Sequence, residues 1–579
     1  MICIFHELYT SNCEVNKKLF ILCPLETIYA NNYGKQVMQK LLLLILVIGF
    51  AGCESDSMSA EQMNQAAPTP STSESGGGLD HTAMGYDLNN LPVVTVEEGQ
   101  LRGTIDDGTL AFLGVPYATA ERFRMPEPVA PWADVRDALV YGETCPIPQQ
   151  TTVSWDEAVW PHLYWSENEN CQFLNVWTQS LEEEAEKPVM VFLHGGGFTN
   201  GSSIEALAYN GANLSEFGDV VVVTLNHRIN ILGSLNLTAY GDEYENAGNT
   251  GMADIFAALE WIQENIETFG GDPDNVTLFG QSGGSGKIVH LMSMPSAEGL
   301  FHKAIAQSTG NASYLTAEQS ARIAEIMLEN HELSELETMP YYDLLEVGEA
   351  ALSQVEEETG ENLSWRPIVD EEYILSAYAD WSSEMPFIAG TTFSERTSSF
   401  VIGDGRKNEW TDAEISENLA ERYGDNAPAI AQEFQALFPD KGIQDAYFYD
   451  ATYRESVYET LERRLSQSEG PVYNYLFAYE APVMGGITPF HCAELMYVFH
   501  NLDIPQVNIA TGGAPSGYKA QDTIAQAWVN FARTGNPSVG EHEWEEFSME
   551  GRGTMVFDAE SYFSGFDDRQ IVEMITSSL

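Results

Sequence analysis

The sequence predicts an α/β protein with a central, mostly parallel sheet flanked by helices and with long inserted loops. From about residue 92 onward, short β-branched runs alternate with helical patterns. The runs are mostly apolar along their length and do not alternate with polar residues, which indicates strands buried on both faces, as in a sheet covered by helices. The chain has 579 residues, 44% of them hydrophobic, and is long enough to bury a large core.

The amino-terminal region predicts an export signal. Residues 41–51 are eleven apolar residues after Lys40, fewer than the ~20 that cross a bilayer and typical of a secretory signal. We therefore expect the true start at Met38, with residues 1–52 comprising a mis-assigned start and a signal peptide. Residues 50–53 (FAGC) resemble a bacterial lipobox, with Phe50 at the position of the usual Leu.

The lipobox predicts lipid attachment at Cys53 and a bacterial lipoprotein anchored on the periplasmic or cell-surface side. The alternative is an ordinary signal peptide with an incidental Cys, which would leave the protein secreted. Residues 53–90 are rich in Ser, Gly, Pro, Gln and acidic residues. Such a segment has too little apolar surface to fold, so we expect a disordered linker after the lipid-attachment Cys.

The charge balance excludes nucleic-acid binding. Against 26 Lys and Arg stand 87 Asp and Glu, a formal net charge of -61, which repels nucleic acids and anionic lipid headgroups. Three Glu and four Lys precede Cys53, so the rest of the chain carries 84 acidic and 22 basic residues. Such self-repulsion requires screening by salt, and we hypothesise a salt-adapted bacterium. A merely soluble acidic exported protein, or attraction of cationic substrates, are the alternatives.

Three cysteines remain for the folded region. Of seven, three precede Met38 and one is Cys53. An oxidising compartment permits one bridge among the others, and Cys145 and Cys171 are the local pair. Closing a loop of that size would stabilise the fold by roughly 3 kcal/mol. Cys492 is then the odd thiol.

The folded region contains three predicted strands and one predicted covering helix. The strands are PVMVFLH (188–194), DVVVVTLN (219–226) and NVTLFG (275–280), and the first and third run into Gly-rich turns. No repeat and no Pro/Gly-rich linker interrupts this region, so we expect one domain over residues 91–579. The helix prediction covers residues 249–269 and rests on apolar residues at helical spacing. These are Met252, Phe256, Leu259, Ile262 and Ile266.

A nucleophile motif follows the third predicted strand. Residues 280–284 read GQSGG, a G-x-S-x-G pattern between a strand and an apolar, helix-like stretch. A Ser on such a sharp turn has a strained backbone and needs small neighbours, and its Oγ is held out at the edge of the sheet. Ser282 is therefore the candidate nucleophile. A Gly-rich turn with a surface Ser is the alternative.

A second Gly-rich motif, HGGGF at residues 194–198, follows the first predicted strand. Its glycines let the backbone approach closely enough to offer N–H groups to an oxyanion, and losing one such donor costs ~3 to 4 kcal/mol of transition-state stabilisation. We assign the oxyanion hole to the backbone amides of Gly196, Gly197 and Gly283. A flexible glycine turn is the alternative.

These motifs belong to a longer resemblance. From about residue 92 to 560 the chain resembles the type-B carboxylesterase/cholinesterase family of the α/β-hydrolase fold. The further matching segments are FLGVPYA (112–118), RF (122–123), Pro126, ENCQFLNV (169–176), NHR (226–228), GNTG (248–251), FGGDP (269–273) and WVNFARTGNP (528–537).

The resemblance implies a triad in the order Ser, Glu, His. The family's G-x-N-x-x-E-G segment is similar to residues 390–396, which places the acid at Glu395, with Thr392 for the family's Asn and Arg396 for its final Gly. Glu384 and Asp380 are nearby acids outside the matching position. A solvated surface carboxylate is the alternative for Glu395.

The general base falls at His491. The family's H-G-x-E-L-x-Y-V-F is similar to residues 491–499, with Cys492 in place of Gly, and we expect Cys492 to be a small buried side chain and no nucleophile. His500 lies outside the matching position. Because only neutral His491 accepts a proton, the rate should rise through a pKa near ~6.5 before any environmental shift.

Three side chains are expected to contact substrate: Trp160, Phe198 and Gln281. Gln281 replaces the family's usual Glu before the nucleophile, which removes a negative charge and weakens the case for a cationic alcohol. Trp160 falls near the place where cholinesterases present a Trp face to a quaternary ammonium group. In such a loop, packing is the commoner role of a Trp.

Taken together, the sequence predicts a serine hydrolase that cleaves small carboxylic esters through an acyl-enzyme intermediate. No metal or organic cofactor is implied, and the oligomeric state is not predicted. Cholinesterase-like or lipase specificity, or a non-catalytic adhesion homologue, are the competing interpretations. The complete set of Ser282, Glu395 and His491 argues against the last of these.

Overall fold

The computed structural model describes residues 90–148, 155–309, 314–399, 406–540, 542–564 and 567–579. These residues belong to one compact unit, Gly85–Leu579. The predicted signal peptide, the lipid-attachment Cys53 and all but the last residue of the predicted linker lie outside the described residues. Within the described part, no helix combines the length and the apolar character that crossing a bilayer requires.

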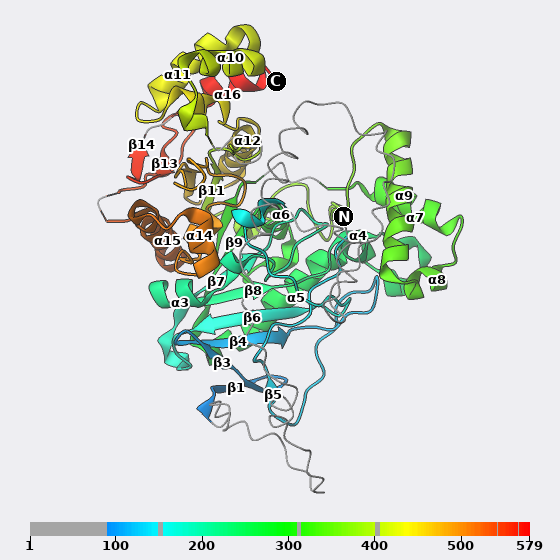
Figure 1. The fold of residues 1–579 in the computed structure, drawn as a ribbon. Helices are drawn as coiled ribbons and strands as arrows, with labels where there is room; N and C mark the ends of the chain where they lie inside the picture. The colour runs from blue at the N-terminus through cyan, green and yellow to red at the C-terminus, as the bar shows by residue number, and fades with distance from the viewer. Residues whose placement is uncertain (1–89, 149–154, 310–313, 400–405, 541, 565–566) are drawn as a thin grey trace, which may run out of the picture. The chain divides into compact units, whose positions relative to one another are not determined.

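A mixed sheet of eleven strands forms the centre of the unit (Figure 1). The seven central strands, in the spatial order β13-β12-β11-β10-β9-β7-β8, pair in parallel with one another. At one edge β6, β4 and β3 pair antiparallel, and at the other edge β14 does so. The predicted α/β class with a mostly parallel sheet is therefore confirmed. In spatial order the strands are β14 (Tyr562–Ser564), β13 (Thr554–Phe557), β12 (Val472–Phe477), β11 (Phe387–Thr392), β10 (Lys303–Gln307), β9 (Gly271–Gln281), β7 (Lys187–Leu193), β8 (Val221–Leu225), β6 (Phe173–Thr178), β4 (Thr109–Pro116) and β3 (Thr104–Asp106).

A second, three-stranded sheet and the helices complete the described secondary structure. The small sheet has the order β1 (Val93–Val96), β2 (Gly99–Arg102) and β5 (Arg136–Asp137). The α-helices are α3 (Ala212–Gly218), α4 (Asn230–Ser234), α5 (Thr250–Asn265), α6 (Gly283–Leu291), α7 (Ala317–Leu328), α8 (Leu333–Thr338), α9 (Tyr341–Thr359), α10 (Asp412–Tyr423), α11 (Ala427–Leu437), α12 (Thr452–Gln467), α13 (Leu495–Val498), α14 (Pro505–Thr511), α15 (Pro515–Thr534) and α16 (Arg569–Thr576).

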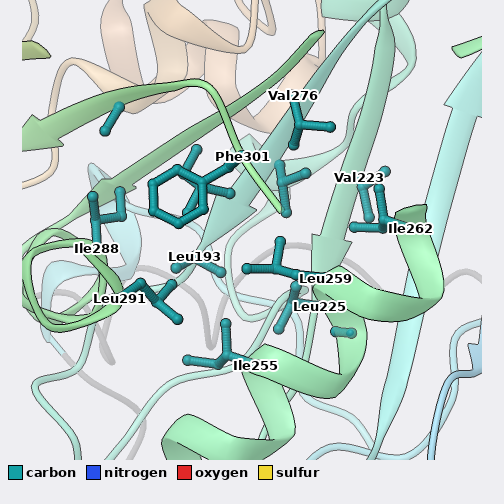
Figure 2. Packing of buried hydrophobic residues seen from close by; sticks show 14 of the residues in the cluster. Leu193, Val223, Leu225, Ile255, Leu259, Ile262, Val276, Ile288, Leu291 and Phe301 are labelled. Carbon is teal, nitrogen blue, oxygen red and sulfur yellow. The ribbon is translucent and has the colours of Figure 1, made fainter. Parts of the chain in front are cut away.

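The main sheet is buried on both faces, as its continuously apolar strands predict. Side chains of β7 alternate between two hydrophobic clusters: Leu193 packs with residues of α5 and α6 on one face, and Phe192 packs with residues of α15 on the other. Figure 2 shows the first cluster, with Ile255 and Leu259 from α5 and Leu291 from α6 around Leu193. These helices hold the strand ends in place from both sides.

The predicted elements are confirmed with small shifts at their ends. β9 begins at Gly271, four residues before the predicted strand 275–280. The extension arises because Gly271 also pairs with Lys187 of β7. The predicted covering helix is α5, and it continues as one tighter helical turn over Ile266–Phe269. Gly270 then ends it with a φ of +74°, a conformation that favours glycine.

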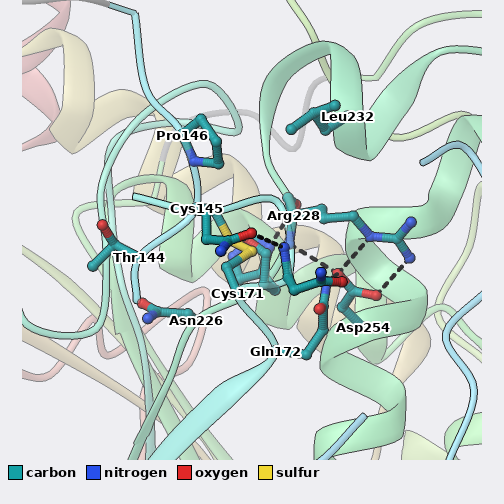
Figure 3. The surroundings of a disulfide bond; sticks show 12 residues. Thr144, Cys145, Pro146, Cys171, Gln172, Asn226, Arg228, Leu232 and Asp254 are labelled. Atoms are coloured by element: carbon teal, nitrogen blue, oxygen red, sulfur yellow. Dashed lines mark hydrogen bonds and ion pairs between the residues drawn. A yellow bond between two sulfur atoms is a disulfide. The ribbon is translucent and has the colours of Figure 1, made fainter. Parts of the chain in front are cut away.

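A disulfide joins Cys145 to Cys171, as predicted, with their Cα atoms 5.0 Å apart (Figure 3). Both cysteines are buried. Beside the bridge, Arg228 forms a buried ion pair with Asp254 at 2.7 Å. The Arg228 backbone N–H also donates to Asp254, so this carboxylate fixes the chain that follows β8. Cys492 is a free thiol, and it is partly exposed and not fully buried as the sequence predicted.

Candidate active site

Four polar side chains follow four neighbouring parallel strands. Ser282 comes directly after β9, Ser308 directly after β10, and Glu395 shortly after β11, whereas His491 lies in the segment after β12. The carboxyl ends of parallel strands meet at one edge of a sheet, which is where α/β proteins place their sites. The sheet order β12-β11-β10-β9 therefore gathers these residues along one edge.

Ser282 has the strained backbone expected of a nucleophile on a strand-to-helix turn. Its φ is +56° and its ψ is −121°, a region that a non-glycine residue rarely adopts. Its N–H donates to the Gln307 carbonyl at 2.9 Å, and its carbonyl accepts from Ser285 Oγ at 2.5 Å. These bonds on both sides hold the strained turn. α6 starts at the next residue, Gly283.

The glycines after Ser282 are required by close backbone approach. A Cβ atom on Gly284 would lie 2.0 Å from the Leu193 carbonyl oxygen at the end of β7. A Cβ atom on Gly283 would lie 2.0 Å from the carbonyl oxygen of Gly197. No real Cβ atom tolerates such distances to backbone, so the GQSGG motif lets α6 pack against the end of β7 and the loop that follows it.

Glu395 and His491 form a hydrogen-bonded pair. Nδ1 of His491 lies 2.5 Å from Oε2 of Glu395, whose side chain is fully buried. The other carboxylate oxygen accepts hydrogen bonds from Ser308 Oγ at 2.6 Å and from the Thr392 N–H at 2.8 Å. The carboxylate is thereby fixed in orientation, and it in turn fixes the imidazole and favours its cationic form.

Ser308 was not predicted as a site residue, because it belongs to no recognisable local motif. The available signal was its position, directly after a buried strand at the edge of the sheet that carries Ser282. The residues that lie outside the matching family positions, Asp380, Glu384 and His500, do not join the Glu395–His491 pair. Asp380 and Glu384 are exposed, and His500 pairs with Asp522 at 2.9 Å.

The electrostatic surroundings raise the pKa of His491 above its usual value. Burial alone would lower this pKa, but the charge and hydrogen bond of Glu395 outweigh burial, and the charges of Glu494 and Asp450 act in the same direction. Burial also raises the pKa of Glu494 to about 7, helped by the charge of Glu395. The imidazole therefore lies among several carboxylates.

Gln281 and Cys492 lie beside His491. Gln281 is fully buried, and its Nε2 lies 3.2 Å from both ring nitrogens of His491. Its Oε1 accepts from the Cys492 thiol at 3.1 Å. Burial and nearby carboxylates raise the pKa of Cys492 well above its usual value. Cys492 has a φ of +75°, which explains why a Gly also suits this position.

The HGGGF loop offers unpaired backbone donors next to Ser282. Gly196 and Gly197 have φ values of +80° and +64°. Within the described part of the chain, the N–H groups of Gly196, Gly197 and Gly283 have no hydrogen-bond acceptor.

Lys287, which the sequence did not indicate, is buried in α6 and donates to the His194 carbonyl at 2.8 Å. It therefore connects the start of the HGGGF loop to the helix after Ser282.

A cavity of about 360 Å³ opens in front of Ser282. Gly197 and Gly283, two of the glycines assigned to the oxyanion hole, line it together with Phe198. The described wall of this cavity does not include Gln281 or Trp160. Trp160 is 6% exposed and packs edge-to-face against the rings of Tyr209 and Phe490, so the structure places it in a hydrophobic core cluster.

Ser282 Oγ and the His491 ring are not hydrogen-bonded to each other in this structure. In the described part of the chain, Ser282 Oγ has no hydrogen-bond partner, and the Gln281 amide lies against the His491 ring. Catalytic hydrogen bonds are often long in proteins without substrate and shorten in the substrate complex. The arrangement can generate an alkoxide at Ser282 once the imidazole accepts its proton.

Comparison with known proteins agrees with this geometry. A model of the carboxylesterase family matches residues 90–567. The chain is 33% identical over 489 residues to the para-nitrobenzyl esterase of Bacillus subtilis (strain 168), covering 81% of this chain and 95% of that protein. It is 32% identical over 472 residues to the phenmedipham hydrolase of Pseudarthrobacter oxydans, covering 77% and 91% of the two chains.

Among solved structures, an esterase from anaerobic Clostridium hathewayi is 36% identical to this chain. The TM-score is 0.77, over 85% of this chain and 99% of that one. Fold, family and relatives together define a carboxylic ester hydrolase of the serine esterase class with the α/β-hydrolase fold. The chain belongs to the type-B carboxylesterase family, so the resemblance seen in the sequence is confirmed.

Proposed function

We propose that Ser282, Glu395 and His491 hydrolyse carboxylic esters through an acyl-enzyme intermediate. His491 accepts the Ser282 proton while Oγ attacks the ester carbonyl, and it then donates that proton to the departing alcohol. Water hydrolyses the acyl-enzyme by the same route. The observation that carries the proposal is the hydrogen bond of His491 to the buried Glu395 carboxylate, with the ring held against Gln281, the residue before the strained Ser282.

The N–H groups of Gly196, Gly197 and Gly283 are proposed to bind the oxyanion. They have free hydrogen-bonding capacity in the described part of the chain, and Gly197 and Gly283 line the cavity with Ser282. Donors fixed before the reaction stabilise negative charge as it develops and need no reorganisation.

The names of the relatives suggest which neutral esters to test first. Similarity to a para-nitrobenzyl esterase supports para-nitrobenzyl esters. Similarity to an esterase that can hydrolyse aliphatic aromatic polyesters supports ester bonds next to an aromatic ring. Choline esters fit the site poorly, because Trp160 is packed in the core and the cavity wall carries arginine and no acidic residue.

The test is hydrolysis of para-nitrobenzyl acetate by the full chain and by Ser282→Ala. We expect kcat to fall by about 10⁴-fold or more in the variant. Ser293→Ala is the matched control, because Ser293 is a buried serine near the same helix whose Oγ donates to Val289 and lies outside the cavity. Equal activity of the parent and Ser282→Ala would show that Ser282 is not the nucleophile.

We also propose that the enzyme is exported and anchored through a lipid at Cys53. The apolar run, the lipobox-like segment and the Cys145–Cys171 disulfide support this location, because disulfides persist in oxidising compartments. Labelled palmitate should enter the protein in a bacterial host and should not enter Cys53→Ser. Labelling of both proteins, or of neither, would contradict the anchor.

A further inference from the structure

The described wall of the catalytic cavity carries basic but no acidic residues, although the protein is strongly acidic. The chain has 87 acidic and 26 basic residues, yet the described residues that line this cavity include Arg366 and Arg396 and no Asp or Glu. By contrast, another polar cavity of the described chain is lined by Glu245, Asp370 and Glu372 and by no Lys or Arg. A pair of cations beside the nucleophile is therefore a local feature that the overall charge does not explain.

Arg366 has no counter-ion among the described residues, and hydrogen bonds anchor the residues on either side of it. It is half-buried, and within the described residues its guanidinium makes no hydrogen bond or ion pair. The neighbouring Trp365 is buried and donates its Nε1–H to Glu349 at 2.6 Å. Two residues further on, the Ile368 N–H donates to Asn249 at 2.8 Å. Burial lowers the pKa of Arg366, so this cation has lost water without gaining a partner.

Arg396 is positioned by stacking and not by an ion pair. Its guanidinium lies 5.0 Å from the centre of the Tyr453 ring, an arrangement that orients a cation and leaves its charge in place. Its backbone N–H donates to Asp450 at 3.0 Å. The second oxygen of Asp450 accepts from the Tyr453 N–H, and the charge of Asp450 also interacts with that of Arg396 without an ion-pair contact. Arg396 directly follows Glu395, at the position where the matching family segment has Gly.

The rest of the wall can also donate hydrogen bonds. Ser364 lies next but one to Arg366 in the chain, and Thr452 and Ser456 lie in the first turns of α12. Arginine offers N–H groups in a planar fork that matches the two oxygens of a carboxylate. A neutral ester needs none of these groups.

We propose that Arg366 and Arg396 form a carboxylate-binding subsite, and that the preferred substrates are esters carrying a free carboxylate, such as monoalkyl esters of dicarboxylic acids. The inference rests on the proposed function and specifies its substrate class. For such a substrate, Ser282 Oγ bonds to the ester carbonyl carbon and the alcohol leaves with a proton. Water then releases the dicarboxylate and regenerates Ser282.

The test compares two esters that differ in one group. Monoethyl adipate and ethyl hexanoate have the same acyl chain length, but the first ends in a carboxylate and the second in a methyl group. We expect kcat/KM of the full chain to be higher for monoethyl adipate. In Arg366→Gln the ratio of the two values should fall about ten- to hundredfold, the range expected for hydrogen bonds to a charged group, and Arg396→Gln should lower it as well.

Two further variants sharpen the comparison. Arg322→Gln removes an exposed arginine of α7 that pairs with surface glutamates, and it should leave the ratio as it is. Arg366→Lys keeps the charge and loses the planar fork, so its ratio should lie between those of the parent and Arg366→Gln. If Arg366→Gln does not fold, the ratio measured for Arg366→Lys tests the carboxylate subsite in its place.

The outcomes separate this inference from the proposed function. If Ser282-dependent hydrolysis shows no preference for monoethyl adipate, or if the ratio is unchanged in the Arg366 variants, the subsite is wrong and the esterase mechanism stands. If neither ester is hydrolysed, calorimetric titration with adipate decides: binding that Arg366→Gln abolishes supports the subsite, and no binding to the parent overturns it.

Discussion

The imidazole of His491 and the carboxylate of Glu395 lie 2.5 Å apart across 96 positions of the chain. The carboxylate is fully buried, and Ser308 and the Thr392 N–H hold its other oxygen. The pair therefore combines a fixed ring orientation with a raised pKa of the imidazole, and both properties affect the pH at which the enzyme works.

The rate of ester hydrolysis should depend on pH through a group that titrates above 6.5. Glu395 raises the pKa of His491, and protonated His491 cannot accept the Ser282 proton. Below the raised pKa of His491 most of the enzyme carries a protonated imidazole and is inactive. We therefore expect kcat/KM to rise with pH through a midpoint above 6.5. The measurement is kcat/KM for ethyl hexanoate against pH.

Two variants identify the titrating group. Glu395→Gln removes the charge that raises the pKa, so the midpoint should move to lower pH and the maximal rate should fall by about 10⁴-fold. Glu494→Gln is the matched control, because Glu494 has a pKa of about 7 and could be mistaken for the base. If the midpoint vanishes in Glu494→Gln, His491 is not the titrating group.

Adding one methyl group at Gly284 should disrupt the nucleophile turn. A Cβ atom there would lie 2.0 Å from the Leu193 carbonyl, so α6 or the end of β7 must move. We expect Gly284→Ala to lower the free energy of unfolding by about 1 to 3 kcal/mol, the usual cost of overpacking. In the same helix, a Cβ on Gly286 would meet Phe198 ring atoms at 3.5 Å or more, so Gly286→Ala should not be destabilised. Urea denaturation of both variants makes the comparison, and equal stability would be inconsistent with the packing described.

Loss of the disulfide should destabilise the fold without unfolding it. The bridge closes a loop of 26 residues in sequence separation, which corresponds to roughly 3 kcal/mol in the entropic model. The double variant Cys145→Ser, Cys171→Ser should lose about this amount in urea denaturation. Adding dithiothreitol should weaken the parent to the level of the variant and leave the variant unchanged. A variant as stable as the oxidised parent would show that the bridge contributes nothing.

Salt should stabilise the folded protein. The net charge is -61, and few acidic side chains are buried, so the repulsion acts mainly across the surface. Raising NaCl from about 0.1 M to about 1 M shortens the screening length from ~10 Å to ~3 Å, and the free energy of unfolding should rise. The gain should shrink near pH 4, where many carboxylates are protonated. A lower stability in high salt would argue against salt adaptation.

Much of the fold and the candidate nucleophile Ser282 could be predicted from local sequence, whereas the other two candidate triad residues came from the family resemblance. Continuous apolarity predicts β7, β8 and β9, because a strand covered on both faces needs no polar side chain. The GQSGG segment predicts the strained turn at Ser282, because a strand that bends sharply into a helix needs small neighbours. Glu395 and His491 followed from matching segments, and Cys145 and Cys171 from their proximity in the chain.

The sequence by itself determined the features that depend on neighbouring residues: the buried strands, the glycine turns, the position of Ser282 and the local disulfide pair. Only the tertiary structure decided which distant side chains share a cavity. It places Trp160 in the core and Gln281 against His491, and it brings Arg366 and Arg396 to the wall in front of Ser282. The reason is physical: backbone geometry and strand burial are set within a few residues, whereas a cavity wall is set by how separate strands and helices pack against one another.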